Sequence, residues 1–211
     1  MSELLNWVGK TDLQLLDLIV QGHLDGVKSV LDAGCGSGRN LHYFARTGAS
    51  VFGVDRNSEA LTKCRTHVSE VAENSQVNNF CVAEVDDLPH KDNQFDLVIS
   101  NAVLHFSRDE DHFRRCLDEM FRVLAPGGWF FARLCSDVGI SDLLTKAKSS
   151  PEPRWKTLPD GSDRFVVDLN WLVKEGQRLG AMQHGRIKTV NVQNLRCMTT
   201  WILRKSEDPP R

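Results

Sequence analysis

A glycine-rich turn between two apolar runs is the feature that most constrains how this chain can fold. The apolar run at 27–31 leads into the turn Asp32-Ala33-Gly34-Cys35-Gly36-Ser37-Gly38-Arg39, and a second apolar run at 51–54 ends in Asp55. This order predicts a strand, a tight turn, a helix and a second strand that ends in a carboxylate. Such a unit is the start of a nucleotide-binding βαβ fold with a parallel sheet.

The residues of the turn discriminate between two kinds of nucleotide ligand. Its three glycines tolerate positive φ and let a ligand approach the backbone closely. The dinucleotide fingerprint G-x-G-x-x-G requires a last glycine where this chain has Arg39. A pyrophosphate would be repelled by Asp32, whereas a cationic amino-acid headgroup would pair with it. The turn therefore favours S-adenosylmethionine over a dinucleotide, with Asp55 accepting the ribose hydroxyls.

The same segment resembles the first motif of the class I S-adenosylmethionine-dependent methyltransferases. Three later segments resemble further motifs of this family in the family's order: an adenine-side loop at 83–89, a fourth-strand motif at 95–105 and a turn into strand five at 124–128. The resemblance covers about half the chain, from 27 to 133. It implies S-adenosylmethionine as the cofactor and S-adenosylhomocysteine as the product.

The expected fold is α/β: a Rossmann-like, seven-stranded, mostly parallel sheet with helices on both faces and a C-terminal antiparallel hairpin. The length favours a single domain over residues 1–211. Apolar patterning predicts seven strands, at 29–32, 50–55, 79–84, 95–101, 129–135, 186–193 and 197–204. Helices are expected at 11–24, 39–46, from 58 onward, at 109–124 and at 168–179. Around this core we expect an N-terminal cap helix within 1–26, opened by a capping box of Thr11 and Gln14, and a frayed tail at 205–211.

Residues at the carboxyl ends of the strands are the candidates for binding the cofactor, because ligands of open α/β sheets bind at that edge. By the resemblance, Glu84 contacts the adenine amino group beside the Val85 backbone, with Asp86 and Asp87 as rivals. The resemblance also turns Asn101 toward the transferred methyl group and the amino group of the cofactor. The full set of predicted cofactor-binding residues is Asp32, Gly34, Cys35, Gly36, Gly38, Asp55, Arg56, Glu84, Val85, Asp86 and Asn101.

His105 follows the fourth strand and is the predicted catalytic residue. A histidine there can take a proton from an acceptor hydroxyl or amine, because its ordinary pKa is near working pH. The alternative is a histidine that only packs in the loop. Methyl transfer from a sulfonium needs alignment more than a catalytic triad, so the absence of a triad is uninformative.

Acceptor specificity is expected outside the resemblance, in the 136–167 segment, which is long for a connection and is predicted to be an acceptor-side loop or lid, with a short helix near 142–148. The alternative is a solvated surface loop. The predicted acceptor-binding residues are His105, Arg133, Asp137, Trp155 and Arg164. Basic side chains among them suit a carboxylate or phosphate on the acceptor.

Composition limits the partners. The formal net charge of −2 gives no reason to expect nucleic-acid binding. The N-terminus shows no signal peptide, no apolar run is long enough for a membrane span, and the six cysteines show no metal or C-x-x-C spacing, which together favour a cytoplasmic protein with reduced thiols and no metal. We expect a monomer or a dimer.

The favoured function is methyl transfer from S-adenosylmethionine to a small molecule, onto oxygen, nitrogen or sulfur. Protein or RNA methylation is the runner-up, although the family's Asn/Asp-Pro-Pro-aromatic motif is replaced by Asn101-Ala102-Val103-Leu104. A catalytically silent cofactor-binding module and a nicotinamide-dependent oxidoreductase are also compatible with a βαβ unit of this kind. Arsenite-type thiol chemistry is disfavoured by cysteines spread through predicted core elements.

Overall fold

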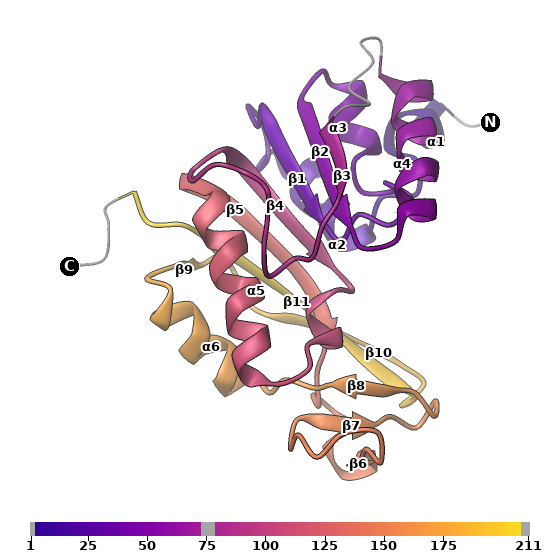
Figure 1. Cartoon of the computed structure of the whole chain (residues 1–211), viewed down its shortest axis with the longest axis vertical. Coiled ribbons are helices and arrows are strands. Elements are labelled where there is room, and N and C mark those ends of the chain that lie inside the picture. The colour runs from indigo at the N-terminus through magenta and orange to yellow at the C-terminus, as the bar shows by residue number, and fades with distance from the viewer. Residues whose placement is uncertain (1–2, 73–78, 208–211) are drawn as a thin grey trace.

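The structure, a computed structural model, describes residues 3–72 and 79–207. Its main sheet has the order β10-β11-β5-β4-β1-β2-β3, and the five strands from β5 to β3 are parallel (Figure 1). These strands are β1 (Ser29–Ala33), β2 (Ser50–Asp55), β3 (Phe80–Val82), β4 (Phe95–Asn101) and β5 (Leu124–Cys135). The strand order reverses between β1 and β4, which places a ligand crevice at their carboxyl ends.

The C-terminal hairpin is confirmed, but the sheet has eight strands rather than seven. β10 (Lys188–Val192) and β11 (Arg196–Arg204) are antiparallel to each other, and β11 runs antiparallel to β5. The additional strand is β9 (Met182–Gln183), which pairs with the far end of β11. Two residues carry too little periodicity to be recognised as a strand, so sequence patterning missed it.

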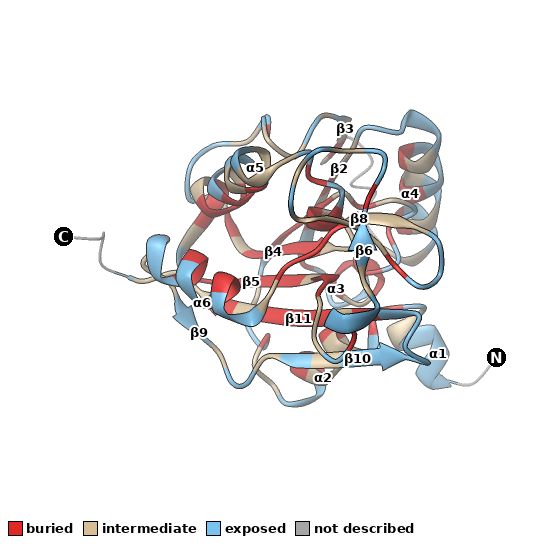
Figure 2. Ribbon diagram, turned by 90° about the horizontal axis from the view of Figure 1, so that it is seen from below, coloured by how far each residue is buried: buried red, intermediate tan, exposed pale blue. Residues whose placement is uncertain are grey.

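Helices cover both faces of the sheet, as expected. One hydrophobic cluster packs the sheet against α5 (Glu110–Val123) and α6 (Leu169–Arg178). The other packs it against α2 (Leu13–Val20), α3 (His42–Arg46) and α4 (Ser58–Val71). Figure 2 shows β4, β5 and β11 buried between these layers, while β10 is exposed at the edge.

The N-terminal segment forms two short helices, α1 (Glu3–Val8) and α2, rather than one cap helix. The predicted capping box is wrong, because Asp12 and not Thr11 is the N-cap of α2 and accepts a hydrogen bond from the Gln14 N–H at 2.9 Å. The Thr11 hydroxyl instead donates to the Arg39 carbonyl. This segment is therefore tied to the glycine turn.

The 136–167 segment contains its own antiparallel sheet of β6 (Thr145–Lys146), β7 (Trp155–Thr157) and β8 (Asp163–Phe165). The helix expected near 142–148 is wrong, since only one 3-10 turn (Ser141–Leu143) precedes β6. Figure 1 shows this small sheet at the bottom of the view, beyond the carboxyl end of β5.

Other boundaries differ from the patterning by a few residues. The helix expected at 39–46 begins only at His42, β3 ends at Val82 and β5 begins at Leu124. The tail is not frayed at its start, because Lys205 donates from its ammonium to the carbonyls of Phe121 and Leu124. The rest of that prediction, for 208–211, lies outside the described residues.

Candidate active site

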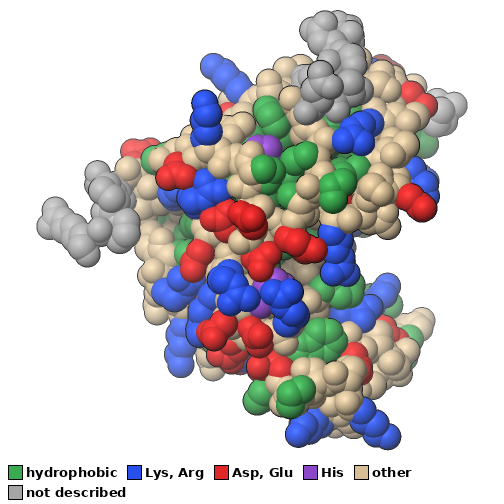
Figure 3. Space-filling model, viewed as in Figure 1, with side chains coloured by type: hydrophobic (Ala, Val, Ile, Leu, Met, Phe, Trp, Pro, Cys, Tyr) green, Lys and Arg blue, Asp and Glu red, His purple; other side chains and the backbone are tan. Residues whose placement is uncertain are grey.

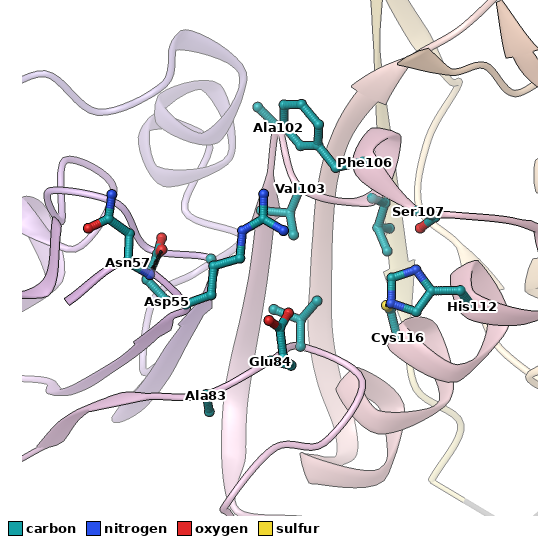
Figure 4. A pocket seen from close by; sticks show the side chains of 14 residues that line it. Asp55, Asn57, Ala83, Glu84, Ala102, Val103, Phe106, Ser107, His112 and Cys116 are labelled. Atoms are coloured by element: carbon teal, nitrogen blue, oxygen red, sulfur yellow. Dashed lines mark hydrogen bonds between the residues drawn. The ribbon is translucent and has the colours of Figure 1, made fainter. Parts of the chain in front are cut away.

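A cavity of about 320 Å³ opens at the carboxyl ends of the parallel strands. Its walls come from the ends of β1, β2, β3 and β4, from the 3-10 turn after β4 (Leu104–Phe106) and from α5 (Figure 4). The lining residues are Gly34, Asp55, Arg56, Asn57, Ala83, Glu84, Val85, Ala102, Val103, Leu104, Phe106, Ser107, His112 and Cys116. Figure 3 shows a hollow in the surface between the N-terminal helices and the small sheet.

Asp55 lies at the tip of β2 with both carboxylate oxygens held by backbone donors. The Gly36 N–H donates to Oδ2 and the Asn57 N–H donates to Oδ1, each at 2.9 Å. Each oxygen has a second lone pair, so the carboxylate can still accept two hydroxyl groups. This fixed orientation suits recognition of a ribose diol.

Glu84 follows β3, and its carboxylate points into the cavity opposite Asp55 (Figure 4). It is exposed and has no ion pair with a described residue. Asp86 pairs with the Arg108 guanidinium at 3.6 Å and lies 3.3 Å from the His112 Nε2, over α5. Glu84 is therefore free to accept an N–H from a ligand, whereas its rival Asp86 is already engaged.

Asp32 is the penultimate residue of β1 and is the most unusual acid near the cavity. Its side chain is 1% exposed, and neither oxygen has a hydrogen bond of good geometry. Burial raises its pKa to about 7, against the lowering effects of the Arg39 charge and the neighbouring Asn40 amide. A buried carboxylate without a donor is costly unless a ligand supplies one. A cationic amino group of a cofactor is such a donor, so this observation fits S-adenosylmethionine.

Close backbone contact explains the first glycine of the turn. A Cβ on Gly34 would lie 2.3 Å from Cγ2 of Val103, and Gly34 has a φ of +87°. On the opposing loop Ala102 adopts a φ of +63°, which is rare for a residue with a side chain and typical of functional loops. The glycine turn and the loop after β4 thus meet at the cavity with no space between them.

The rest of the turn lies beside the cavity. A Cβ on Gly36 would meet no atom within 4 Å, so this position is open to a ligand, whereas one on Gly38 would lie 2.6 Å from the Cys64 sulfur. Cys35 is buried, and its pKa is raised by the neighbouring Cys64 thiol and by burial. Gly38 and Cys35 therefore serve packing of the turn against α4.

The wall formed by α5 was not anticipated. His112 and Cys116 face the cavity one helical turn apart, with Nε2 and Sγ 3.6 Å from each other. The His112 ring accepts the Arg108 N–H at Nδ1, so Nε2 carries the hydrogen of the neutral ring. Their i, i+4 spacing behind the N-cap Asp109 was the sequence signal for a shared face.

Asn101 and Arg133 are neighbours at the ends of β4 and β5. The Arg133 guanidinium binds the buried Asp12 carboxylate at 2.5 Å, and Arg39 approaches the same carboxylate at 3.7 Å. Asn40 also holds Asp12 in place, because its side-chain oxygen accepts a hydrogen bond from the Asp12 N–H. These contacts hold the N-terminal segment against the glycine turn and the carboxyl end of β5.

His105 lies between two cavity-lining residues, Leu104 and Phe106, but does not line the cavity itself. Its ring is 5% exposed, packs edge-on against Phe106 and leaves Nδ1 without a partner. Burial, with the charges of Arg164 and Arg196, lowers its pKa to about 4. The imidazole is therefore neutral at physiological pH.

Side chains at the start of β7 and directly before it bind the small sheet to residues next to the cavity. The Trp155 indole N–H donates to the carbonyls of Ser107 and Arg108, at 2.9 and 3.0 Å. Arg154 pairs with Glu110 at 2.8 Å and with Asp168 at 3.1 Å. These contacts join the segment to the start of α5 and the N-cap of α6.

The remaining predicted acceptor residues lie on either side of this junction. Arg164 on β8 stacks over the Phe106 ring, with its guanidinium carbon 4.9 Å from the ring centre. Asp137 lines a separate shallow hollow with Arg154 and Lys156, and its pKa is raised by burial and by Asp168. His105 and Arg164 are thus close together, whereas Asp137 is apart from them.

The cavity unites five of the predicted cofactor residues: Gly34, Asp55, Arg56, Glu84 and Val85. The other six do not line the cavity. They lie in the glycine turn, at Asp86 beside α5 or at the ends of β1 and β4, and are Asp32, Cys35, Gly36, Gly38, Asp86 and Asn101. Residues 3–72 and 79–207 contain no group of three His, Cys, Asp or Glu side chains arranged to hold a metal ion. Within the same residues no helix is long and apolar enough to cross a membrane.

Sheet order and cavity place the chain among the Rossmann-like α/β proteins. Residues 31–132 match the sequence model of the methyltransferase domain family. Similar folds include a SAM-dependent methyltransferase of Methanosarcina mazei, with a TM-score of 0.69 and 21% identity over 90% of this chain and 98% of that chain. Another is magnesium protoporphyrin IX methyltransferase of Synechocystis with bound S-adenosylhomocysteine, at a TM-score of 0.68 and 19% identity, covering 92% of this chain and 81% of that one. Residues 31–132 are thus a methyltransferase domain of the class I S-adenosylmethionine-dependent type.

Curated relatives are similar over the cofactor half. An arsenite methyltransferase of Aquipseudomonas alcaligenes is 33% identical over 136 residues, which are 60% of this chain and 38% of the relative. A fatty-acid O-methyltransferase of Mycolicibacterium smegmatis is 37% identical over 112 residues, which are 52% of this chain and 38% of the relative. The chain thus spans less than half the length of these relatives, and the similarity concerns the cofactor domain rather than the acceptor.

Proposed function

We propose that this protein transfers a methyl group from S-adenosylmethionine to a small-molecule acceptor. The observation that carries the proposal is the buried Asp32 carboxylate, which has no hydrogen-bond partner and lies beside the cavity. On the cavity wall, the carboxylates of Asp55 and Glu84 can still accept hydrogen bonds from a ligand. S-adenosylmethionine, when bound, supplies a sulfonium methyl group. Asp55 would hold the ribose, Glu84 and the Val85 backbone the adenine, and Asp32 the amino group.

His105 would act as the general base on the acceptor side. Its neutral imidazole has an unpartnered Nδ1, and it lies beside the cavity-lining turn after β4. Burial and two arginines hold its pKa near 4, so the imidazole would be unprotonated across the physiological range but a weaker base than a free histidine.

The acceptor would enter between the turn after β4 and the small sheet. Arg164 is positioned there over Phe106, and the fastened 136–167 segment gives this side a wall of fixed shape. A small acceptor is supported by the names of the relatives, which include arsenite, fatty-acid and, among solved structures, didemethyltoxoflavin methyltransferases. We further propose that the N-terminal helices and the 136–167 segment belong to the same single domain and complete its site.

Thiol-based arsenite chemistry is less well supported by the geometry. Five of the six cysteines are buried in core elements, and burial raises the pKa values of Cys116 and Cys135 to about 12. Thiolates are the reactive form, so these groups are suited to packing.

The first test is calorimetric titration of the protein with S-adenosylmethionine, S-adenosylhomocysteine and NAD. We expect binding of the two sulfur compounds and none of NAD. Asp55→Ala should weaken their binding by about 1–3 kcal/mol, because the ribose edge loses its acceptor. Asp25→Ala, which removes an exposed carboxylate in a distant turn, is the matched control.

A screen of small acceptors with S-adenosylmethionine, read out as S-adenosylhomocysteine released, then tests turnover. Product with a small molecule supports the proposal. Cofactor binding without turnover on any acceptor class would mean a silent binding module, and binding of NAD alone would return the chain to the oxidoreductases.

A further inference from the structure

A second hollow, of about 540 Å³, lies next to the glycine turn and between the helices α1, α3 and α4. These three helices are at the top of the molecule in Figure 1. α1 packs on α3, and α3 packs on α4. The lining residues are Leu5, Asn6, Gly9, Lys10, Ser37, Arg39, His42, Arg46, Lys63, His67, Glu70 and Val71. None of them lines the cofactor cavity, so the two hollows are distinct.

Positive charge dominates this hollow. Four of its lining residues, Lys10, Arg39, Arg46 and Lys63, are cationic, whereas Glu70 is the one acid among the lining residues. Lys10, Arg46 and Lys63 form no salt bridge with any residue in the described ranges. The chain has a formal net charge of −2, yet these three positive charges have no salt-bridge partner among the described residues.

A neutral group rather than a carboxylate holds one of the arginines in place. The Arg46 guanidinium lies 4.9 Å from the centre of the Trp7 ring, a cation–π arrangement that fixes the side chain without neutralising it. Among the four cations, Arg39 alone has a salt bridge within the described residues, to Asp12 at 3.7 Å. The charges of Lys10, Arg46 and Lys63 are thus available to a ligand.

Two histidines among the lining residues hydrogen-bond to each other. The His42 Nε2 donates to the Asn6 carbonyl at 3.0 Å, and the His42 Nδ1 lies 3.2 Å from the His67 Nε2. Burial and the neighbouring His42 lower the pKa of His67. The ring nitrogens that these contacts join are occupied, so recognition falls to the lysine and arginine side chains.

We propose that this hollow is a binding site for a small ligand that carries a phosphate or diphosphate group. Several cations around one concave space exceed what a single carboxylate would neutralise, whereas a phosphate dianion or a diphosphate matches them. Leu5 and Val71 on the rim offer apolar contact to the body of such a ligand. The site is independent of the methyl-transfer proposal, because it shares no lining residue with the cofactor cavity.

Inorganic pyrophosphate, titrated calorimetrically into the full chain at low salt, is the probe. We expect saturable binding with a Kd below about 1 mM. The double variant Lys10→Glu/Lys63→Glu should weaken binding by at least about tenfold, because two attractive charges become repulsive. Lys174→Glu, the same charge reversal on an exposed face of α6, is the control and should retain most of the affinity.

S-adenosylhomocysteine titrated into the same variants separates this inference from the proposed function. Its affinity should stay unchanged in the double variant and in the presence of pyrophosphate. Non-saturable binding, an equal loss in Lys174→Glu, or competition between pyrophosphate and S-adenosylhomocysteine would overturn the second site.

A sedimentation assay with phosphatidylglycerol vesicles tests the main rival occupant, because Leu4 and Trp7 on α1 are exposed next to the same cations. We expect no co-sedimentation, or co-sedimentation that pyrophosphate abolishes. Vesicle binding that pyrophosphate leaves intact would assign the cations to a lipid surface and overturn the proposal of a small-ligand site.

Discussion

The two walls of the candidate active site differ in how their polar groups are partnered. On the cofactor wall, Asp32 has no partner and Glu84 faces the open cavity. On the predicted acceptor side, Arg133 is bound to Asp12 and the Trp155 indole to two backbone carbonyls, while the Ser107 hydroxyl and the His105 Nδ1 have no partner. Unmet hydrogen-bonding capacity marks surfaces prepared for a ligand, whereas satisfied groups mark surfaces that hold the protein together. The cofactor wall thus offers polar groups that a ligand can bind, whereas the acceptor wall mainly offers a fixed shape.

The largest expected effect tests His105, an acceptor-side group that departs from this contrast. His105→Gln should reduce turnover about 10²-fold with cofactor affinity intact, because the unpartnered Nδ1 is the proposed proton acceptor. The measurement is kcat for an identified acceptor together with calorimetry for S-adenosylhomocysteine. Trp7→Phe, at an exposed position, is the control. A loss below threefold would assign His105 to packing.

Removing the fastener of the N-terminal segment should be costly in stability. Arg133→Gln leaves the buried Asp12 carboxylate without its closest cation, so the free energy of unfolding should fall by about 2–3 kcal/mol. Urea denaturation measures this, with Arg186→Gln on an exposed turn as the control. Unchanged stability together with lost acceptor binding would instead make Arg133 a ligand of the acceptor.

Asp32→Asn should stabilise the ligand-free protein by on the order of 2 kcal/mol at pH 8. The folded protein raises the pKa of Asp32 from 3.8 to about 7, so it holds this proton more tightly than the unfolded chain. Its stability therefore declines as pH rises from about 4 to 7 and levels off above. The variant should lose that decline and bind the cofactor more weakly.

Urea denaturation at pH 5 and pH 8 checks this, with Asp25→Asn as the control. If the variant and the native protein showed the same pH dependence, Asp32 would have a donor in the ligand-free state, and the contrast between the two walls would be lost.

The smallest effect concerns the indole anchor. Trp155→Phe keeps the ring but removes the donor to the Ser107 and Arg108 carbonyls, which should lower stability by about 1 kcal/mol. Thermal unfolding measures this change, with Trp7→Phe as the matched control. A large rise in KM for the acceptor without a change in stability would make Trp155 an acceptor ligand.

The cofactor wall could be predicted from sequence because its signals are local. The glycine turn, the carboxylate at the end of β2 and the loop after β3 each follow a short apolar run, and parallel strands bring such ends to one edge. The cavity accordingly includes Gly34, Asp55 and Glu84. What local signals could not give was the complete burial of Asp32 without a hydrogen-bond partner.

The acceptor wall escaped prediction because its contacts join distant parts of the chain. Arg154 pairs with Glu110, 44 positions away, and Arg133 with Asp12, 121 positions away. The hydrophobic periodicity of a sequence does not indicate such distant partners. Arginines whose charge would suit an anionic ligand are therefore found paired with carboxylates of the protein itself. The strands β6 to β8 have two or three residues each and were likewise below the length at which alternation is readable.

The contact between Gly34 and Val103 has a consequence for how the protein can vary. A side chain at 34 would meet the methyl groups at 103, so the cofactor turn and the loop that leads to His105 share a fixed volume. The two loops are expected to change together, a larger residue in one requiring a smaller residue in the other. Attempts to redirect acceptor specificity by enlarging position 103 would therefore first displace the cofactor turn, which couples the evolution of the second substrate site to the first.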